Sequence, residues 1–252
     1  MYLSIILPYF KKKKYIKQTL NSIINQSFKN HELIIIYDQI DRSDISYIKK
    51  IIKNKIKYKI IINKKNLGVG KSRNIGIKNS KSKYIAFCDA DDVWHKKKSE
   101  VQLNLMREKK ISFSHTDYNL INNRNKIIGE MVVKKTLSYN DLLRSCDIAL
   151  SSVILKRSLL IESLKFGDTK TKEDFFLWLK ISKREVIHGI NKKLINWRKT
   201  ENSLSSDIIQ KLIDAFIVFD KVKKQNFFIT FYYVIRLSIY YIFKKIKQKK
   251  YL

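Results

Sequence analysis

Short apolar runs rich in β-branched residues alternate with segments of helical spacing in the first part of the chain. The runs have the length of buried strands and cover Leu3–Leu7, Leu33–Tyr37, Lys59–Ile62 and Tyr84–Cys88. Between them, apolar residues recur at helical spacing, which predicts helices over Tyr15–Ile24 and Ile45–Ile52 and a shorter one from about Lys71. Strands that alternate with helices form βαβ units, so the sequence predicts an α/β fold with a mainly parallel central sheet and flanking helices.

The second half of the chain gives weaker signals. The stretch from about Asn119 to Leu137 is polar and irregular, and Leu142–Leu164 mixes helical and extended patterns, so we assign no elements there. From Ser203 onward the pattern is helical, and no Pro-rich or Gly-rich linker precedes it. We therefore expect one α/β domain over residues 1–206 and a helical extension over residues 207–252.

The extension contains an aromatic and aliphatic segment, Phe227–Phe243, with lysines on both sides. The segment is shorter than the ~20 apolar residues of a membrane span, and Arg236 at its centre would cost roughly 2.5–3.5 kcal/mol inside a bilayer. An in-plane helix on anionic lipid and an amphipathic helix packed on the domain both fit the pattern, and both stay open. A transmembrane helix ranks third.

The chain is strongly basic, with 53 Lys and Arg against 22 acids and a formal net charge of +31. Such a charge points to an anionic partner: nucleic acid, an acidic membrane surface or a phosphorylated substrate. The lysines are scattered and the chain lacks the signatures of zinc fingers or RNA-binding strands, which argues against a dedicated nucleic-acid domain.

Cysteine usage and the N-terminal residues indicate the compartment. Cys88 and Cys146 are the only cysteines, and Cys88 lies in a predicted buried strand, so we expect free thiols in a reducing cytosol. The apolar run at the N-terminus is too short for a signal peptide, precedes its lysines and ends at Pro8. We interpret it as the first strand.

Three carboxylates follow one of the predicted strands, in Asp89-Ala90-Asp91-Asp92. Ligands of open α/β sheets bind at the carboxyl ends of the strands, and grouped carboxylates repel unless a cation or solvent relieves them. Mg²⁺ or Mn²⁺ bound by one or two carboxylates, with water and substrate phosphates completing its shell, would do so. A solvated acidic turn is the alternative, and the isolated pattern alone favours that alternative.

Two further segments carry candidate chemistry. Gly68-Val69-Gly70-Lys71-Ser72 resembles the end of a P-loop, but the pattern fails because Lys65 stands where it requires glycine. Glycine-rich backbone before a helix, with Arg73 close by, still favours an anion, although an ordinary helix start explains it equally. Thr171-Lys172-Glu173-Asp174 looks like a capped helix N-terminus, where a carboxylate could instead act as a general base. The histidines have no ligand spacing and predict no metal site; they are His31, His95, His115 and His188.

Taken in order, these pieces resemble the family 2 glycosyltransferases of the GT-A fold, the inverting, nucleotide-sugar-dependent type that builds bacterial surface polysaccharides. Ser4–Tyr9 is similar to the opening strand of the family and its turn, and Glu32–Asp38 to the second strand with its nucleotide-recognition acid. Asn66–Gly68 with Ser72–Gly76 resembles the N-x-G and A-R-N-x-G segment.

The resemblance continues in the second half of the domain. Ala86–Trp94 is similar to the family signature F-L-D-A-D-D-x-W, and Glu173–Leu179 to its E-D-x-x-L-W-L block. Trp197-Arg198 ahead of Asn202–Ser205 is similar to its closing segment, so the match extends over most of residues 1–206.

The resemblance implies a role for each matching residue. Asp174 would be the general base. Asp91 and Asp89 would hold a divalent metal, Mg²⁺ or Mn²⁺, on the donor diphosphate. The residues implied to bind the nucleotide sugar are Pro8, Tyr9, Asp38, Arg73, Asp89, Ala90 and Asp91.

The chain departs from the family pattern at two places. Tyr37-Asp38-Gln39-Ile40 replaces the usual D-D-G-S, so one acid and a turn glycine are missing. Lys199 and Thr200 follow Trp197-Arg198 where the family often has a histidine that helps to bind the metal. The first departure leaves open which nucleotide base the donor carries. The second implies that the metal binds more weakly or depends more on ligands from the substrate.

The sequence therefore predicts an inverting glycosyltransferase that moves a sugar from a nucleotide-diphosphate donor to a hydroxyl of a lipid-linked or polysaccharide acceptor. We expect it in the cytoplasm, in peripheral contact with the anionic inner face of the membrane. A sugar-phosphate nucleotidyltransferase is the first alternative, although Pro8-Tyr9-Phe10 lacks the glycines that it would need. A basic nucleic-acid-binding or scaffold protein without catalysis is the second.

Overall fold

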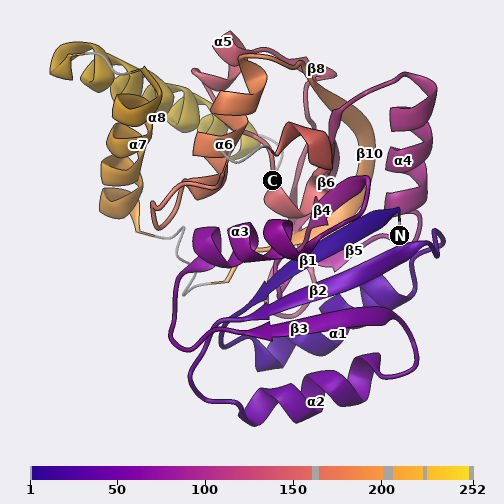
Figure 1. The fold of residues 1–252 in the computed structure, drawn as a ribbon. Helices are drawn as coiled ribbons and strands as arrows, with labels where there is room; N and C mark the ends of the chain where they lie inside the picture. The colour runs from indigo at the N-terminus through magenta and orange to yellow at the C-terminus, as the bar shows by residue number, and fades with distance from the viewer. Residues whose placement is uncertain (1, 161–164, 201–206, 224–225, 250–252) are drawn as a thin grey trace.

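The computed structural model describes residues 2–160, 165–200, 207–223 and 226–249. A single ten-stranded sheet runs through the middle of this part of the chain, with helices on both faces (Figure 1). The strands are β1 (Leu3–Tyr9), β2 (His31–Tyr37), β3 (Lys57–Ile62), β4 (Tyr84–Phe87), β5 (Val93–Trp94), β6 (Phe113–Ile121), β7 (Ile127–Met131), β8 (Thr136–Leu137), β9 (Ile154–Lys156) and β10 (Ile187–Arg198). The helices are α1 (Lys13–Ile24), α2 (Ser43–Ile52), α3 (Val69–Asn79), α4 (Lys98–Glu108), α5 (Tyr139–Leu142), α6 (Glu173–Ser182), α7 (Ile208–Lys223) and α8 (Phe227–Lys249).

The sheet has a parallel half and a mixed half. Its order is β3-β2-β1-β4-β9-β6-β10-β5, and the pairs among β3, β2, β1 and β4 are all parallel. Beyond β4 the order is mixed, because β9 pairs antiparallel with both β4 and β6 while β10 runs parallel to β6. The predicted α/β fold with flanking helices is confirmed, and its first four strands are those the pattern predicted.

Strand β1 is central and is buried on both faces. Ile5 belongs to an apolar cluster that includes α1, α2 and α4, whereas Ile6 belongs to a second cluster on the other face that includes α6 and α7. Because successive side chains of a strand point to opposite faces, a strand covered on both sides has a continuous apolar run instead of an alternating one. This explains why Leu3–Leu7 contains no polar residue other than Ser4.

The first strand continues through Pro8 to Tyr9, two residues beyond the predicted end at Leu7. Even-numbered residues of β1 bond toward β4, since the Ile6 carbonyl accepts from the Cys88 amide, whereas the Tyr9 carbonyl accepts from Asp38 on the other side. β4 ends at Phe87, which is paired with Ile6, so no carbonyl of β4 lies opposite Pro8. Proline is tolerated there because Pro8 lies past the last pair of this ladder, so its missing N–H interrupts no bond between the paired residues of β1 and β4.

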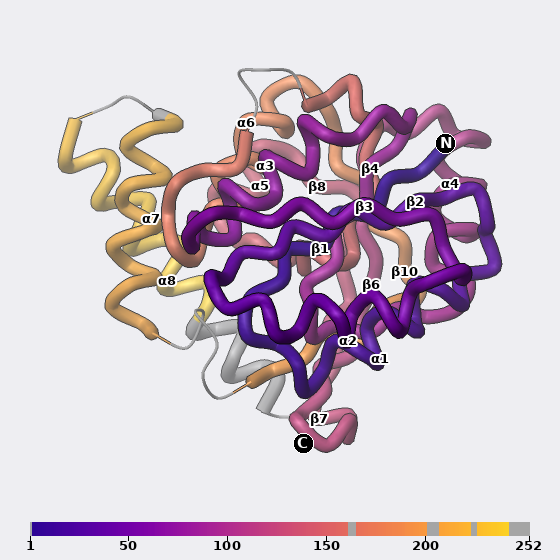
Figure 2. Tube along the Cα trace, turned by 60° about the horizontal axis from the view of Figure 1, so that its bottom comes forward, coloured from indigo at the N-terminus to yellow at the C-terminus, as the bar shows by residue number. Residues whose placement is uncertain are grey.

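The C-terminal helices α7 and α8 lie side by side at one side of the molecule (Figures 1 and 2). Ala215, Val218 and Phe219 of α7 join the apolar cluster that contains Ile6, and α8 adds Val234. The predicted domain boundary at residue 206 lies outside the described residues. Within the described residues, no helix is both long enough and apolar enough to span a bilayer.

Gly76 of α3 is a close-contact position. A Cβ atom at Gly76 would overlap the side chain of Ile6 in the central strand. We predict that Gly76→Ala lowers the free energy of unfolding by about 1–3 kcal/mol, because overpacking outweighs the roughly 1 kcal/mol that alanine gains in a helix. Urea denaturation measures this change. Gly129→Ala is the matched control, since the nearest atom to its Cβ would lie 3.6 Å away, and an equal loss in both variants would contradict the packing argument.

Candidate active site

The carboxyl ends of β1, β2 and β4 meet at one edge of the parallel half of the sheet. Tyr9 ends β1, Asp38 follows β2, and Asp89 comes two residues after β4. The Asp38 amide donates to the Tyr9 carbonyl at 2.9 Å, so the first two ends are joined directly. Tyr9, Asp38 and Asp89 thus belong to the same edge of the sheet.

The three acids after β4 have different surroundings. Asp92 is buried: its Oδ2 accepts from the Ser151 hydroxyl at 2.5 Å and its Oδ1 from the Arg198 amide at 2.8 Å. Burial raises the pKa of Asp92 well above its usual range, and the neighbouring Asp91 and Asp89 add to the rise. Asp92 therefore fastens this turn to β10 and to the segment around Ser151.

Asp89 and Asp91 each meet one cation. Arg73 Nη2 lies 2.7 Å from Asp89 Oδ1, and Lys12 Nζ lies 2.6 Å from Asp91 Oδ2. Burial raises the pKa of Asp91; Lys12 opposes the rise, and the like charge of Asp89 adds to it. Ala90 between them is buried, and its carbonyl accepts from the Thr19 hydroxyl at 3.1 Å, which fixes the turn.

Arg73 is only 3% exposed and lies between two elements. Besides the bond to Asp89, its Nη1 pairs with Glu173 Oε1 at the start of α6, and its guanidinium lies 5.3 Å from the ring centre of Phe166. Burial raises the pKa of Glu173 to about 7, and Arg73 opposes that rise. The guanidinium joins the end of β4 to the helix that carries Asp174.

Asp174 is the second residue of α6 and is half-buried. Its Oδ1 accepts from the Phe175 amide at 2.7 Å. Burial raises its pKa and Arg73 opposes the rise. A carboxylate with a raised pKa at the edge of a site has the properties of a general base.

The predicted cap at Thr171 is wrong. The helix begins at Glu173, and the residue before it, Lys172, provides no side-chain cap. The Thr171 amide and hydroxyl both donate to Asp214 Oδ2 of α7, each at 2.8 Å. Thr171 therefore bonds a residue of another helix and does not cap the helix that follows it.

Asp38 organises the loop between β3 and α3. It accepts from Asn63 Nδ2 at 2.7 Å, from the Leu67 amide at 2.9 Å and from the Gly68 amide at 3.0 Å. Gly68 has φ +85°, a conformation that favours glycine. The loop that resembled a P-loop end is therefore held against the sheet by Asp38.

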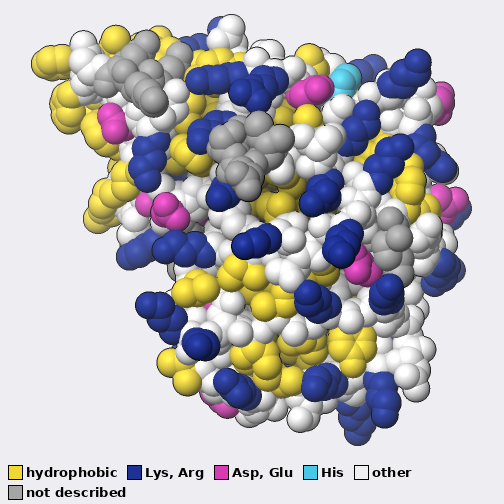
Figure 3. Space-filling model, viewed as in Figure 1, with side chains coloured by type: hydrophobic (Ala, Val, Ile, Leu, Met, Phe, Trp, Pro, Cys, Tyr) yellow, Lys and Arg dark blue, Asp and Glu magenta, His cyan; other side chains and the backbone are white. Residues whose placement is uncertain are grey.

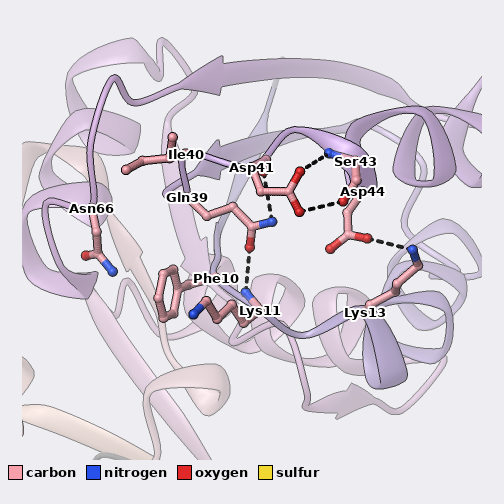
Figure 4. Close-up of a pocket in the computed structure, with 9 residues that line it drawn as sticks. All are labelled: Phe10, Lys11, Lys13, Gln39, Ile40, Asp41, Ser43, Asp44 and Asn66. Atoms are coloured by element: carbon pink, nitrogen blue, oxygen red, sulfur yellow. Dashed lines mark hydrogen bonds and ion pairs between the residues drawn. The ribbon is translucent and has the colours of Figure 1, made fainter.

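A pocket of about 590 Å³ opens beside the ends of β1 and β2. Figure 4 shows Phe10 and Ile40 at one end of it and the ion pair of Lys13 and Asp44, 3.0 Å, at the other. Its lining comprises Phe10, Lys11, Lys13, Gln39, Ile40, Asp41, Ser43, Asp44 and Asn66.

Tyr9 does not line the pocket, but it bonds to one of the residues that do. Its hydroxyl donates to Asp44 Oδ2 at 2.6 Å and its ring stacks on Tyr37 at 5.2 Å. Burial raises the pKa of Tyr9, so the hydroxyl stays a donor. Gln39, which stands where the family has glycine, accepts from the Lys11 amide at 2.8 Å and donates to the Tyr37 hydroxyl at 2.8 Å.

The acids at the end of β4 fit a divalent cation held mainly by its substrate. Asp89 and Asp91 repel each other, and in each only one carboxylate oxygen is engaged by the cationic partner described above. In the part of the chain that the structure describes, no group of three or more His, Cys, Asp or Glu side chains converges on a metal position. Two carboxylates completed by water and phosphate oxygens are the usual environment of Mg²⁺.

Several residues of the site carry no sequence signal of their own. Lys12, one of a run of four lysines, is the one that pairs with Asp91. Ser151 lies in a segment to which the pattern assigned no element, although its hydroxyl bonds Asp92 and accepts from the Asp89 amide at 3.0 Å. Glu173 stands in the sequence as a helix-start acid and as the first residue of the E-D-x-x-L-W-L block, and neither position predicts its ion pair with Arg73. These contacts join residues far apart in sequence, so spacing alone could not reveal them.

Comparison with known proteins assigns the class. Residues 4–162 match the profile of glycosyl transferase family 2, and the chain belongs to this family. This confirms the predicted glycosyltransferase and decides against the nucleotidyltransferase and the non-catalytic scaffold.

Two relatives in Escherichia coli extend over most of the chain. Both are UDP-Glc:alpha-D-GlcNAc-diphosphoundecaprenol beta-1,3-glucosyltransferases. WfgD is 34% identical over 211 residues, 83% of this chain and 81% of WfgD. WfaP is 33% identical over 215 residues, 83% of this chain and 82% of WfaP.

TarS of S. aureus, solved in complex with UDP-GlcNAc, has the same fold. It superposes with a TM-score of 0.73 at 20% identity, over 88% of this chain and 65% of the TarS structure. The predicted GT-A architecture is confirmed.

The division of roles among the acids can be tested by stability. We predict that Asp92→Ala lowers the free energy of unfolding by about 2–4 kcal/mol, because it leaves the Ser151 hydroxyl and the Arg198 amide buried without an acceptor. Asp91→Ala, which removes one partly exposed ion pair, should change it by less than about 1 kcal/mol. Urea denaturation of both variants measures the difference, and equal losses would show that Asp92 has no special structural role.

Proposed function

We propose that the protein is a metal-dependent, inverting glycosyltransferase that moves a sugar from a UDP-linked donor to a hydroxyl of a lipid-diphosphate-linked sugar. One observation carries the proposal: Arg73 joins Asp89, at the predicted metal position, to the start of the helix that bears Asp174. A donor-binding acid and a candidate base are thereby held in one ion-paired unit. The names of WfgD and WfaP support the choice of UDP-glucose and of a GlcNAc-diphosphoundecaprenol acceptor.

In this proposal the nucleoside binds along the ends of β1 and β2. The pocket lined by Phe10, Ile40 and Asn66 has the size and the mixed apolar and polar lining that suit a base and ribose. Pro8 and Tyr9 form its support, and Asp38 shapes the neighbouring loop. The three bonds that Asp38 already makes favour an indirect role in base recognition, through the position of Leu67 and Gly68.

The diphosphate lies beside Asp89, Ala90 and Asp91. A divalent cation bound there would neutralise the charge that develops on the leaving diphosphate. Arg73 and Lys12 supply fixed positive charge close to the same oxygens, and the buried Asp92 keeps the turn in place.

Asp174 takes the proton of the acceptor hydroxyl in this scheme. The oxygen attacks the anomeric carbon as the bond to the nucleoside diphosphate breaks on the opposite face, so one displacement inverts the centre. The raised pKa of Asp174 increases its basicity toward a neutral hydroxyl, and Glu173 is not available for the same task because Arg73 binds it.

Peripheral contact with an anionic membrane belongs to the same proposal. An acceptor on a long lipid stays in the bilayer, so the transferase has to work at its surface, on the cytoplasmic side where nucleotide sugars are made. The net charge of +31 favours that surface.

Nucleotide binding tests the donor site. We predict that UDP with Mn²⁺ raises the melting temperature by about 5 °C at roughly a hundredfold excess over Kd, whereas GDP, CDP and dTDP give smaller shifts. Asp91→Ala should abolish the metal-dependent part of the shift. A thermal-shift assay of wild type and variant, with and without Mn²⁺, measures both.

The control is Glu108→Ala, which removes an exposed acid at the end of α4 and should keep the whole shift. Transfer of glucose from UDP-glucose to GlcNAc-diphosphoundecaprenol, lost in Asp174→Asn with UDP binding intact, tests the base separately. Nucleotide-independent melting of the wild type, or transfer by Asp174→Asn at the wild-type rate, would refute the corresponding assignment.

A further inference from the structure

The outer sides of α7 and α8 expose large apolar side chains. We call this surface the hairpin face. It comprises Ile208, Ile209, Leu212, Ile213, Phe227, Phe228, Ile229, Phe231, Tyr232, Ile235, Ile239, Tyr240 and Tyr241, of which Phe228 is the most exposed at 79%. In the space-filling view the apolar side chains gather over α7 and α8 at the upper left, with basic side chains beside them (Figure 3). Contiguous apolar surface of this kind marks an interaction site.

A groove of about 440 Å³ runs between the two helices within this face. It is lined almost entirely by apolar side chains, among them Leu212, Phe231 and Ile235. Its one polar lining residue, Ser238, donates its hydroxyl to the Val234 carbonyl within α8, so the groove suits acyl chains or another apolar surface better than a polar ligand.

The two helices α7 and α8, which we call the hairpin, pack on the rest of the domain with the side opposite the hairpin face. Phe219 of α7 packs on Phe175 of α6 at a centroid distance of 5.7 Å and on Tyr233 of α8 at 5.4 Å. Thr230 and Val234 of α8 are buried as well. Because the inner side is already packed, the hairpin face cannot turn inward and stays available to a partner.

The charges of the C-terminal segment indicate which kind of partner the hairpin face binds. From Phe227 to the last residue the sequence has no Asp or Glu and contains Arg236, Lys244, Lys245, Lys247, Lys249 and Lys250. The exposed acids of the hairpin, Asp207 and Asp220, stand at the two ends of α7. Aromatic residues with lysines and no acids form the composition of helices that lie in the interface of an anionic membrane.

We propose that the hairpin face docks on an anionic lipid bilayer, with Phe and Tyr side chains of α8 in the headgroup region. The reason for membrane docking rests on the proposed function, in which the acceptor is lipid-linked. The choice of the docking surface rests on the exposed apolar residues. It unites the two interpretations of Phe227–Phe243 that the sequence left open, because α8 packs on the domain with one side and presents the other.

Vesicle binding tests the hairpin face. The double variant Phe228→Ser, Tyr232→Ser should bind vesicles of phosphatidylcholine mixed with phosphatidylglycerol about tenfold more weakly than wild type. Binding of the wild type should also weaken with added salt, and with vesicles of phosphatidylcholine alone. The matched control, Ile127→Ser with Val132→Ser, removes exposed apolar residues outside the hairpin and should bind as wild type does. Flotation with the vesicles measures the bound fraction.

Three results would overturn the proposal. The first is equal binding by the double variant and wild type, and the second is no binding by either. The third is a dimer in light scattering that the double variant abolishes, which would make a second copy of the chain the occupant. The melting shift with UDP and Mn²⁺ should be the same in all three proteins, so failure of the membrane proposal and failure of the donor site can be told apart.

A separate observation carries a second inference, about Asp214 of α7. This carboxylate is 2% exposed, and its Oδ2 accepts both bonds from Thr171, two residues before Glu173. Its Oδ1 accepts from Gln210 at 3.1 Å, in the same helix. We infer that Asp214 is a positioning residue that fixes the start of α6, and with it Asp174, relative to the hairpin.

Thr171 allows a conservative test. Thr171→Val removes the hydroxyl donor, whereas Thr171→Ser keeps it. We predict faster hydrogen exchange over the first turn of α6 in the valine variant, and a kcat about fivefold lower with an unchanged KM for UDP-glucose. The serine variant should restore both values. If Thr171→Val lowers the melting temperature while exchange in α6 and kcat stay at wild-type values, Asp214 has only a structural role. The exchange measurement decides this point even without turnover.

Discussion

The buried guanidinium of Arg73 is the interaction on which the site depends. A charge removed from water has to be paired, and loss of one partner of a buried pair costs about 3–5 kcal/mol. Arg73 has two partners, Asp89 after β4 and Glu173 at the start of α6, and it comes itself from α3. Two neighbouring segments, α3 and the turn after β4, are thus held to α6, which lies 100 residues further along the chain. Asp174 follows Glu173 directly in α6, so Arg73 also positions Asp174, the candidate base. The same guanidinium binds Asp89 at the candidate metal site.

Around this ion-paired unit the acids divide into structural and chemical groups. Asp38 and Asp92 each accept several bonds from the protein, and they organise the loops on either side of the site. Asp91 and Asp174 have raised pKa values because they are partly buried; Lys12 opposes the rise at Asp91, and Arg73 and Lys172 oppose it at Asp174. A raised pKa alone does not separate the two groups, because burial also raises the pKa of the structural Asp92 and of Glu173. The number of protein donors that each carboxylate binds does separate them: Asp92 accepts two hydrogen bonds from the protein and Asp38 three.

The sequence predicted β1, β2 and β4 because each is an apolar run that is buried on both faces. It predicted β3, an exposed edge strand, from the β-branched run Ile60-Ile61-Ile62. It did not predict the mixed half. β10 interrupts its apolar residues with the exposed Asn191-Lys192-Lys193, and β9 has only three residues. Asp89, Asp91 and Asp174 could be found since each lies beside a strand end or a helix start. Lys12, Ser151 and Asp214 could not, because their importance comes from contacts made only in the folded chain.

The attachment of the C-terminal hairpin has a consequence for catalysis at a surface. A flexible tether would raise the local concentration of enzyme near an acceptor without orienting the site. Here two independent contacts fix the orientation: Phe219 packs between Phe175 and Tyr233, and Asp214 binds Thr171. Phe175 and Thr171 lie on either side of Asp174 in sequence. If the hairpin rests on a bilayer, it therefore fixes the orientation of Asp174 relative to the hydroxyl of a membrane-bound acceptor. Such orientation lowers the part of the activation free energy that comes from bringing the reacting groups together.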